Sequence, residues 1–323
     1  MDAPAFINPS RRVVIAGTLA SAVPFLSSRA AAGARVLHID SYHEGNEWND
    51  RIAAAVLDTL SPAGVDVRIV RMDTKRKPSE ADKSAAAGMV RAEIEAFKPD
   101  VVTMSDDNAV KYVLMPFFRD ADLPFVFCGL NWDASAYELP YRNTTGMVEV
   151  SPIPQIVRLL KTHARGERIG YLAENTPTKT KELSYHEKLF GLTYDRIFLV
   201  SSFDEWKRAF KESQQAVDML IFLGVGSVTD WDRWAALDLT ERETRIPVGT
   251  DFAWLAPYTL LAVAKRPEEQ GRWAAQAALR ILDGVSPANI PLTYNTEGDL
   301  IFNMRIAQRL QIAEAPPLAK LIQ

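Results

Sequence analysis

Short β-rich runs alternate with helical patterns along the chain, and this alternation limits its possible folds more than any other feature. The first cycle predicts a strand over Arg35 to Asp40 and a helix over Glu47 to Leu60. Further strands are predicted over residues 65–72, 101–105 and 124–128, with helices over 79–97 and 108–120. Such strand–helix–strand units form right-handed crossovers in a parallel sheet. The first half is therefore predicted to be a doubly wound α/β unit.

The alternation resumes after a turn-rich linker, Tyr141 to Gly146, and repeats the same architecture. Predicted strands lie at residues 147–150, 168–173, 195–200, 219–224, 246–250, 290–292 and 300–303. Predicted helices lie at residues 154–164, 179–190, 203–213, 230–238, 267–283 and 306–310. Two similar halves in one chain of this length are expected to form two lobes facing each other across a cleft.

The first 32 residues have the pattern of an export signal. An arginine pair at 11–12 precedes an uncharged run over 13–26, and Ala30 and Ala32 precede a predicted cleavage site near Gly33. The run is shorter than the roughly 20 apolar residues that span a bilayer. We expect twin-arginine export to the periplasm and a freely diffusing mature protein. The alternative is a frayed amphipathic terminus.

Composition and charge exclude several classes of protein. Apolar residues make up 47% of the chain and charged residues 24%, which is ordinary for a folded protein. The net charge is −4, and no dense basic surface that would bind nucleic acid is predicted. Cys128 is the only cysteine, so an internal disulfide is impossible, and its apolar neighbours predict burial.

Polar and aromatic residues gather directly after the predicted strands. Ligands of open parallel sheets bind at the carboxyl ends of strands, where helix N-termini offer unpaired N–H groups. The candidate binding residues of the first half are Ser41, Tyr42, His43, Trp48, Asp106, Asp107, Asn108, Asn131 and Trp132. Those of the second half are Glu174, Asn175, Gly224, Asp251 and Phe252. The mixture suits a small polar ligand with an apolar part.

Each candidate also has a structural interpretation. We expect at least one of Ser105, Asp106 and Asp107 to do no more than cap the next helix. His38, Asp40, His43 and Glu44 lack the helical spacing of a metal site, so no metal is expected, and no motif indicates a cofactor. No Gly-x-Ser-x-Gly motif occurs and the adjacent aspartates need not converge, so we expect no enzymatic activity.

Several segments resemble one family. The segments are Ser41 to His43 with Trp48, Ser105 to Ala109, Phe125 to Asn131, Glu269 to Ala275, Ile281 to Gly284, Ile290-Pro291 and Asn303. They are similar in order and spacing to the ABC-transporter substrate-binding proteins of the tryptophan/tyrosine-binding type. The resemblance covers nearly the whole mature chain.

The resemblance implies a type I periplasmic-binding fold with three crossovers, expected near residues 133–150, 252–259 and 284–291. The first lobe would then comprise residues 33–150 and 252–285, and the second 151–251 and 286–323. It further implies a monomer that captures a small metabolite by hinge closure and delivers it to a membrane permease. The identity of the ligand does not carry over from the resemblance. The carboxylates and aromatic residues after the predicted strands instead suggest a small polar or aromatic metabolite, amino-acid-like or an amine. The alternative is a ligand-binding partner of a membrane receptor kinase.

Overall fold

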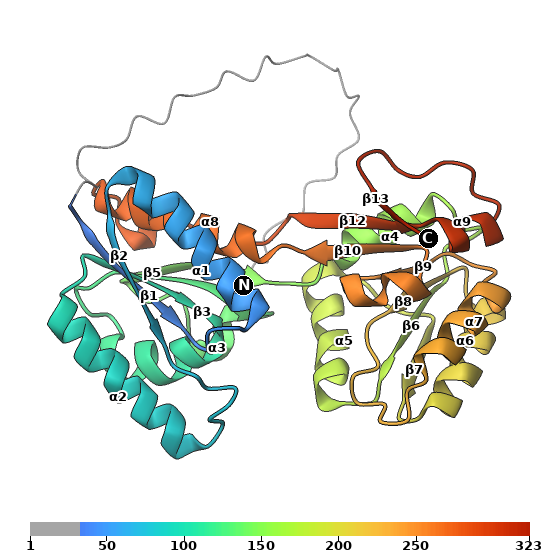
Figure 1. Ribbon diagram of the computed structural model, residues 1–323, viewed down its shortest axis with the longest axis horizontal. Helices are drawn as coiled ribbons and strands as arrows, with labels where there is room; N and C mark the ends of the chain where they lie inside the picture. Colours follow the sequence, from blue (N-terminus) through green and yellow to red (C-terminus); the bar gives the residue numbers. More distant parts are fainter. Residues whose placement is uncertain (1–32) are drawn as a thin grey trace, which may run out of the picture.

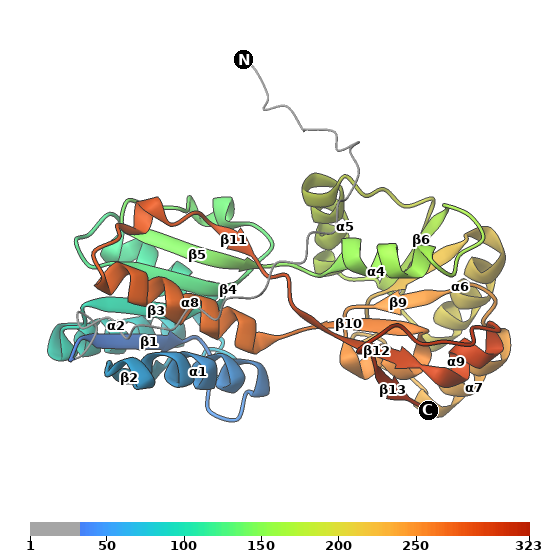
Figure 2. The ribbon, with the colours of Figure 1, turned by 90° about the horizontal axis from the view of Figure 1, so that it is seen from above.

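The computed structural model describes residues 33–323, which form two α/β lobes lying side by side and joined by three segments (Figure 1). The proposed signal, residues 1–32, lies outside the described residues. Each lobe is built around its own sheet, and each sheet has helices on both faces (Figure 2). The predicted α/β class with two parallel-dominated lobes is confirmed.

The first sheet is wholly parallel, with strand order β11-β5-β4-β3-β1-β2. Its strands are β1 (Arg35–Asp40), β2 (Asp66–Arg71), β3 (Val101–Ser105), β4 (Phe125–Asn131), β5 (Thr144–Glu149) and β11 (Thr293–Tyr294). Its helices are α1 (Glu47–Leu60), α2 (Glu80–Phe97), α3 (Asp106–Ala109) and α8 (Pro267–Leu282). The other helical segments of this lobe are the short 3-10 helices η1 (Ser61–Ala63), η3 (Ala134–Tyr137) and η5 (Pro287–Asn289), and the π-helix η2 (Val110–Phe118).

The second sheet has strand order β13-β12-β10-β9-β8-β6-β7, and the β10–β12 pair is antiparallel. Its strands are β6 (Ile169–Glu174), β7 (Arg196–Val200), β8 (Met219–Phe222), β9 (Val248–Thr250), β10 (Leu261–Lys265), β12 (Gly298–Asn303) and β13 (Lys320–Ile322). Its helices are α4 (Ile153–Lys161), α5 (Pro177–Phe190), α6 (Phe203–Ala216), α7 (Arg233–Glu243) and α9 (Met304–Arg309), with the short turn η4 (Ala253–Tyr258).

Local sequence explains where the main helices begin. Ser79 and Ser202 each accept a hydrogen bond from the backbone N–H three residues on, at the starts of α2 and α6. Pro267 opens α8 and two glutamates follow in its first turn, where they complement the helix dipole. Val36, Ile52 and Ala274 are fully buried where α1 and α8 pack on the first sheet. Cys128 is buried in the same cluster, as predicted.

Two strands lie in other places than the sequence indicated. β10 was not predicted, and it pairs with β9 and β12 in the second sheet, whereas residues 252–285 were assigned to the first lobe. β11 pairs with β5 in the first sheet, although residues 286–323 were assigned to the second lobe. The segments between the sheets therefore lie at residues 150–152, at Arg266 and at 295–297.

Candidate functional site

A cleft of about 930 Å³ lies between the lobes and is lined by both of them. The first lobe contributes Tyr42, Asn46, Glu47, Trp48, Arg51, Lys75, Asp106, Asn131 and Glu149. The second lobe contributes Asp251, Phe252, Ala253, Trp254, Ala264, Lys265, Asp299, Leu300, Ile301, Leu318 and Lys320. Its volume suits a small metabolite.

Fourteen residues were predicted as binding candidates, and the structure brings six of them to the cleft. These six are Tyr42, Trp48, Asp106, Asn131, Asp251 and Phe252. Most come directly after a strand, since the carboxyl ends of β1, β3, β4 and β9 face the gap between the lobes. The other eight candidates do not line this cleft.

Several of the eight hold neighbouring backbone in place. Ser41 Oγ donates to the Ser105 carbonyl and accepts from the N–H of Ala109, so it provides hydrogen-bond partners for two backbone groups at the end of β3 and in the turn that follows. None of Ser105, Asp106 and Asp107 caps that turn with its side chain, so the expectation that one of them would do only that is wrong. Asn108 donates to Thr74 Oγ1 at 2.8 Å.

Asp107 also braces its own lobe. Its Oδ2 accepts from the amide of Asn131 at 2.7 Å and its Oδ1 from the hydroxyl of Tyr137 at 2.7 Å. These bonds fix the end of β4 and the turn η3. Asp107 thus positions Asn131, which lines the cleft.

The remaining candidates of the second lobe lie around one loop. Glu174 Oε2 accepts from the N–H of Ser227 at 2.5 Å, and Gly224 and Gly226 lie against the Glu174 carboxylate. Gly224 has φ 115°, a conformation that other residues rarely adopt. The backbone N–H of Asn175 donates a hydrogen bond to the carbonyl oxygen of Val200. The carboxylate of Glu174 therefore supports the loop after β8.

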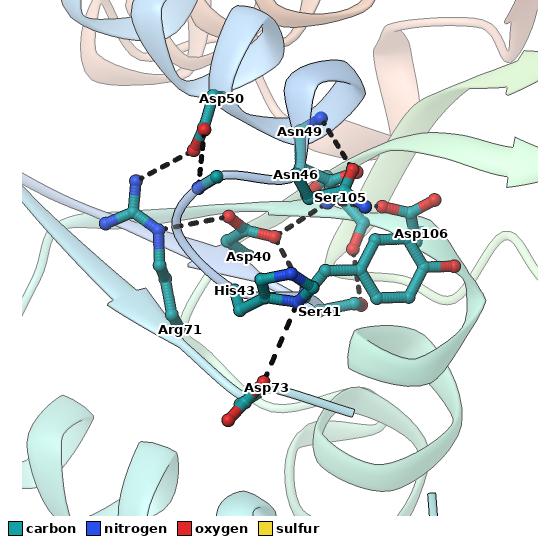
Figure 3. A network of polar contacts seen from close by, with 12 residues as sticks. Asp40, Ser41, His43, Asn46, Asn49, Asp50, Arg71, Asp73, Ser105 and Asp106 are labelled. Atoms are coloured by element: carbon teal, nitrogen blue, oxygen red, sulfur yellow. Dashed lines mark hydrogen bonds and ion pairs between the residues drawn. The ribbon is translucent and has the colours of Figure 1, made fainter. Parts of the chain in front are cut away.

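His43 Nδ1 lies 3.7 Å from Asp73 Oδ1 (Figure 3). His38 is instead buried in β1, where its Nδ1 lies 3.0 Å from Thr103 Oγ1 and burial lowers its pKa to about 4. Among the described residues, no group of three His, Cys, Asp or Glu side chains is arranged to hold a metal ion.

A buried polar network underlies the first-lobe wall of the cleft (Figure 3). Asn49 Nδ2 donates to Asp40 Oδ1 and to Asp106 Oδ2, each at 2.6 Å. Asp40 also receives the N–H of Tyr42 and lies 3.4 Å from Arg71 Nε. Asp106 is 4% exposed and has φ 70°, a left-handed conformation that Asp and Asn tolerate better than most residues.

The environment of Asp106 disfavours its charged form. Burial raises its pKa well above the usual value, the hydrogen bond from Asn49 opposes this, and the carboxylates of Glu149, Asp107 and Asp40 raise it further. The folded state therefore binds a proton that the unfolded state has already lost. Stability attributable to this group is present at low pH and is lost as pH rises through the folded pKa.

We predict that Asp106→Asn raises the melting temperature of the ligand-free protein above that of the wild type at neutral pH. The gap should narrow as pH falls toward 4, because both side chains are then uncharged. Thermal melts of the two proteins between pH 4 and 8 measure it. A gap that stayed constant with pH would show that Asp106 is ionised throughout.

The floor of the cleft carries an ion pair between the lobes. Lys265 Nζ, at the end of β10, lies 2.7 Å from Glu149 Oε1, at the end of β5, and 5.7 Å from the ring centroid of Trp48. Burial alone would lower the pKa of Lys265, but Glu149, Asp251 and Glu182 together raise it above its usual value. Lys265 therefore stays charged and holds the lobes together electrostatically.

Asp251 faces the cleft from the second lobe. Its Oδ2 accepts from Ser151 Oγ at 2.6 Å, while its Oδ1 is buried and has no hydrogen-bond partner among the described residues. Phe252 and Trp254 follow it, with ring centroids 5.9 Å apart, and Trp254 is 52% exposed. This wall offers a carboxylate beside apolar rings.

The lobes also touch away from this cleft. Trp132 stacks on Tyr185 of α5 with ring centroids 5.7 Å apart and an interplanar angle of 4°. Beside it, Lys188 Nζ lies 2.6 Å from Asp133 Oδ2. Trp132 thus contributes to packing between the lobes and does not line the cleft.

Glu149 and Lys265 line the cleft but were not among the residues predicted to bind the ligand. Glu149 ends β5 and could have been found by the strand-end rule, because a strand over residues 147–150 was predicted. Lys265 ends β10, which was not recognised.

Two hinged α/β lobes with a lined cleft between them define a type I periplasmic-binding fold. The sequence pattern of the family described as ABC transporter substrate binding protein matches residues 46–320, so the chain belongs to this family. Proteins of this family bind solutes outside the cytoplasm and are not enzymes. None of the described helices combines the length and apolar character that crossing a membrane requires.

Solved structures share the fold at low sequence identity. A ligand-free, open substrate-binding protein with adhesive properties from Clostridium difficile matches with a TM-score of 0.68 and 15% identity, over 90% of this chain and 99% of that one. An ABC domain in complex with L-Trp from Streptococcus pneumonia matches with a TM-score of 0.52 and 18% identity, over 90% and 100%. A periplasmic ribose ABC transporter protein from Conexibacter woesei gives 0.56 and 15%, over 88% and 96%. No curated protein matches the chain.

Proposed function

We propose that this protein is the periplasmic solute-binding component of an ABC importer and captures a small amine or amino-acid-like metabolite with an aromatic or apolar part. The observation that carries this proposal is the pairing of Asp106 from one lobe with Asp251 from the other on a single cleft. Carboxylates on both walls favour a ligand with a positively charged or multiply donating group. Tyr42, Trp48 and Phe252 supply ring faces for the apolar part.

Capture would proceed by hinge closure about the three segments between the sheets. Each lobe alone offers only part of the contacts, so a ligand that touches both walls binds the closed state more tightly and shifts the population toward it. The closed form would then be recognised by a membrane permease. We further propose that residues 1–32 direct export, that cleavage occurs near Gly33, and that the mature protein acts as a monomer.

The first test is to identify what binds. The chain from Gly33 onward is purified, co-purifying molecules are identified by mass spectrometry, and melting is screened with amino acids, amines and sugars. A ligand at a hundred times its dissociation constant adds about 2.7 kcal/mol to the free energy of unfolding. Conversion of any compound into a product would contradict a pure binding role.

We predict that Asp251→Asn weakens the response to an identified ligand at least tenfold, because the variant lacks the charge of the unpartnered carboxylate. Its ligand-free melting temperature should change little, since asparagine can still accept the hydrogen bond from Ser151. Calorimetric titration measures the affinity. The exposed Asp58→Asn is the matched control and should bind as the wild type does. Equal affinity of both variants would remove Asp251 from the site.

A further inference from the structure

Two buried carboxyl groups of the first lobe share one amide nitrogen. Asn49 Nδ2 carries two hydrogens, and the bonds to Asp40 and Asp106 at 2.6 Å use both (Figure 3). The 3.2 Å contact of the same nitrogen with Ser105 Oγ offers no further donor. Among residues 33–323, no Lys, Arg or His forms an ion pair with Asp106.

The two carboxyl groups differ in what surrounds them. Asp40 has the Arg71 guanidinium at 3.4 Å and the N–H of Tyr42 at 2.8 Å, both of which favour its anion. Asp106 has neither contact. A proton shared by this pair therefore belongs on Asp106.

The elements packed around Asp106 add negative charge to its surroundings. Glu149 at the end of β5 and Asp107 of α3 both disfavour its anion, and the phenol of Tyr42 faces it. Cys128 of β4 stays a neutral thiol, because burial raises its pKa well above the usual value. Lys265, the buried cation of this cleft, is already bound to Glu149.

The second lobe places a carboxylate oxygen without a hydrogen-bond partner at the same cleft. Asp251 is 3% exposed, and its Oδ1 lacks a hydrogen bond within the described chain. A buried, unpartnered carboxylate oxygen costs free energy that a donor from a ligand would offset. Asp251 therefore lacks a donor that a ligand bound in the cleft could supply, and Asp106 lies on the opposite wall of the same cleft.

We propose that the ligand carries a primary ammonium group that binds between Asp106 and Asp251, and that Asp106 releases its proton to solvent when this group arrives. One positive charge leaves as a proton and one enters as the ammonium ion, so the net charge of the cleft is conserved. The three hydrogens of the ammonium group suit the two carboxylates and one further acceptor. This inference rests on the proposed capture of a solute in the cleft.

Infrared spectroscopy of the ligand-free protein tests whether Asp106 carries a proton before the ligand binds. At pH 7 we expect the carbonyl band of a protonated carboxylic acid, which is lost in Asp106→Asn and retained in the exposed control Asp58→Asn. Absence of the band in the wild type, or its persistence in Asp106→Asn, would overturn the inference without bearing on solute capture.

Titration with tryptamine tests whether a bound ammonium group displaces the proton of Asp106. Indole-3-propionic acid, which lacks an amine, is the control probe. Tryptamine should bind, abolish the carboxylic acid band and release up to one proton, measured by calorimetry in two buffers of different ionisation enthalpy. As pH increases toward the folded pKa of Asp106, the affinity for tryptamine should rise by up to tenfold per pH unit, because tryptamine competes with the proton. Asp106→Asn should bind it more weakly and release no proton.

Three results would contradict the proton exchange. Tryptamine could bind with the band intact, indole-3-propionic acid could bind as tightly, or no amine in the screen could bind. If sugars or other neutral solutes still raise the melting temperature, solute capture stands and the ammonium site falls. If no solute of any class binds, the proposed function itself fails.

Discussion

Lys265→Met should lower the free energy of unfolding by about 3–5 kcal/mol, the typical cost of removing one partner of a buried ion pair. The side chains of Lys265 and Glu149 are 16% and 9% exposed, so water screens their interaction little. Removal of the lysine leaves the Glu149 carboxylate without its ion-pair partner. Urea unfolding at pH 7 measures the change.

The double variant Glu149→Gln/Lys265→Met distinguishes loss of the ion pair from the cost of leaving one buried charge without a partner. It removes both charges, so it should recover a large part of the stability that Lys265→Met loses. Double-mutant analysis with Glu149→Gln gives the coupling energy between the two residues. A double variant that is as unstable as the sum of the two single variants would show that the ion pair contributes nothing.

The second large effect is expected where α8 crosses α1. An added Cβ at Gly271 would lie 2.2 Å from the carbonyl oxygen of Ile52 and 3.0 Å from the Ala55 Cβ, so the two helices would have to move apart. Forcing extra volume into a packed interface typically costs about 1–3 kcal/mol. Gly271→Ala should therefore destabilise the first lobe by at least this amount, measured by urea unfolding.

Gly88→Ala on α2 is the matched control. Gly88 also lies inside a helix, but nothing lies within 4 Å of an added Cβ there, and the position is exposed. Alanine should stabilise this helix by about 0.5–1 kcal/mol, because glycine loses more backbone freedom on folding. If both variants were stabilised, close contact between α1 and α8 would not be the reason for glycine at position 271.

The sequence predicted most of the fold because its elements are long and strongly patterned. The helix over Glu47 to Leu60 and the strand over Arg35 to Asp40 were predicted with the bounds that the structure has. β10 was missed because no helix is predicted between it and the preceding strand, and its antiparallel pairing with β12 is set by residues far along the chain. β11 has two residues, which is too short for a recognisable period.

The site was predicted in position but not in detail. The strand-end rule selected Asp106 and Asp251 because strand order alone brings those ends to one cleft. It could not separate Asp106, which turns into the cleft, from its neighbour Asp107, which turns back to Tyr137. That difference arises from the left-handed backbone at Asp106 and from long-range packing, neither of which local sequence records.

The first sheet is covered on one face by α8 and edged by β11, which come from the last fifth of the chain. A fragment that ends at Val150 would expose Val36, Val126 and Cys128, which α8 covers in the whole protein. During synthesis, the lobe that is made first thus waits for residues beyond 290 before its core closes. The first lobe therefore lacks part of its core until segments that follow most of the second lobe in the sequence have been made.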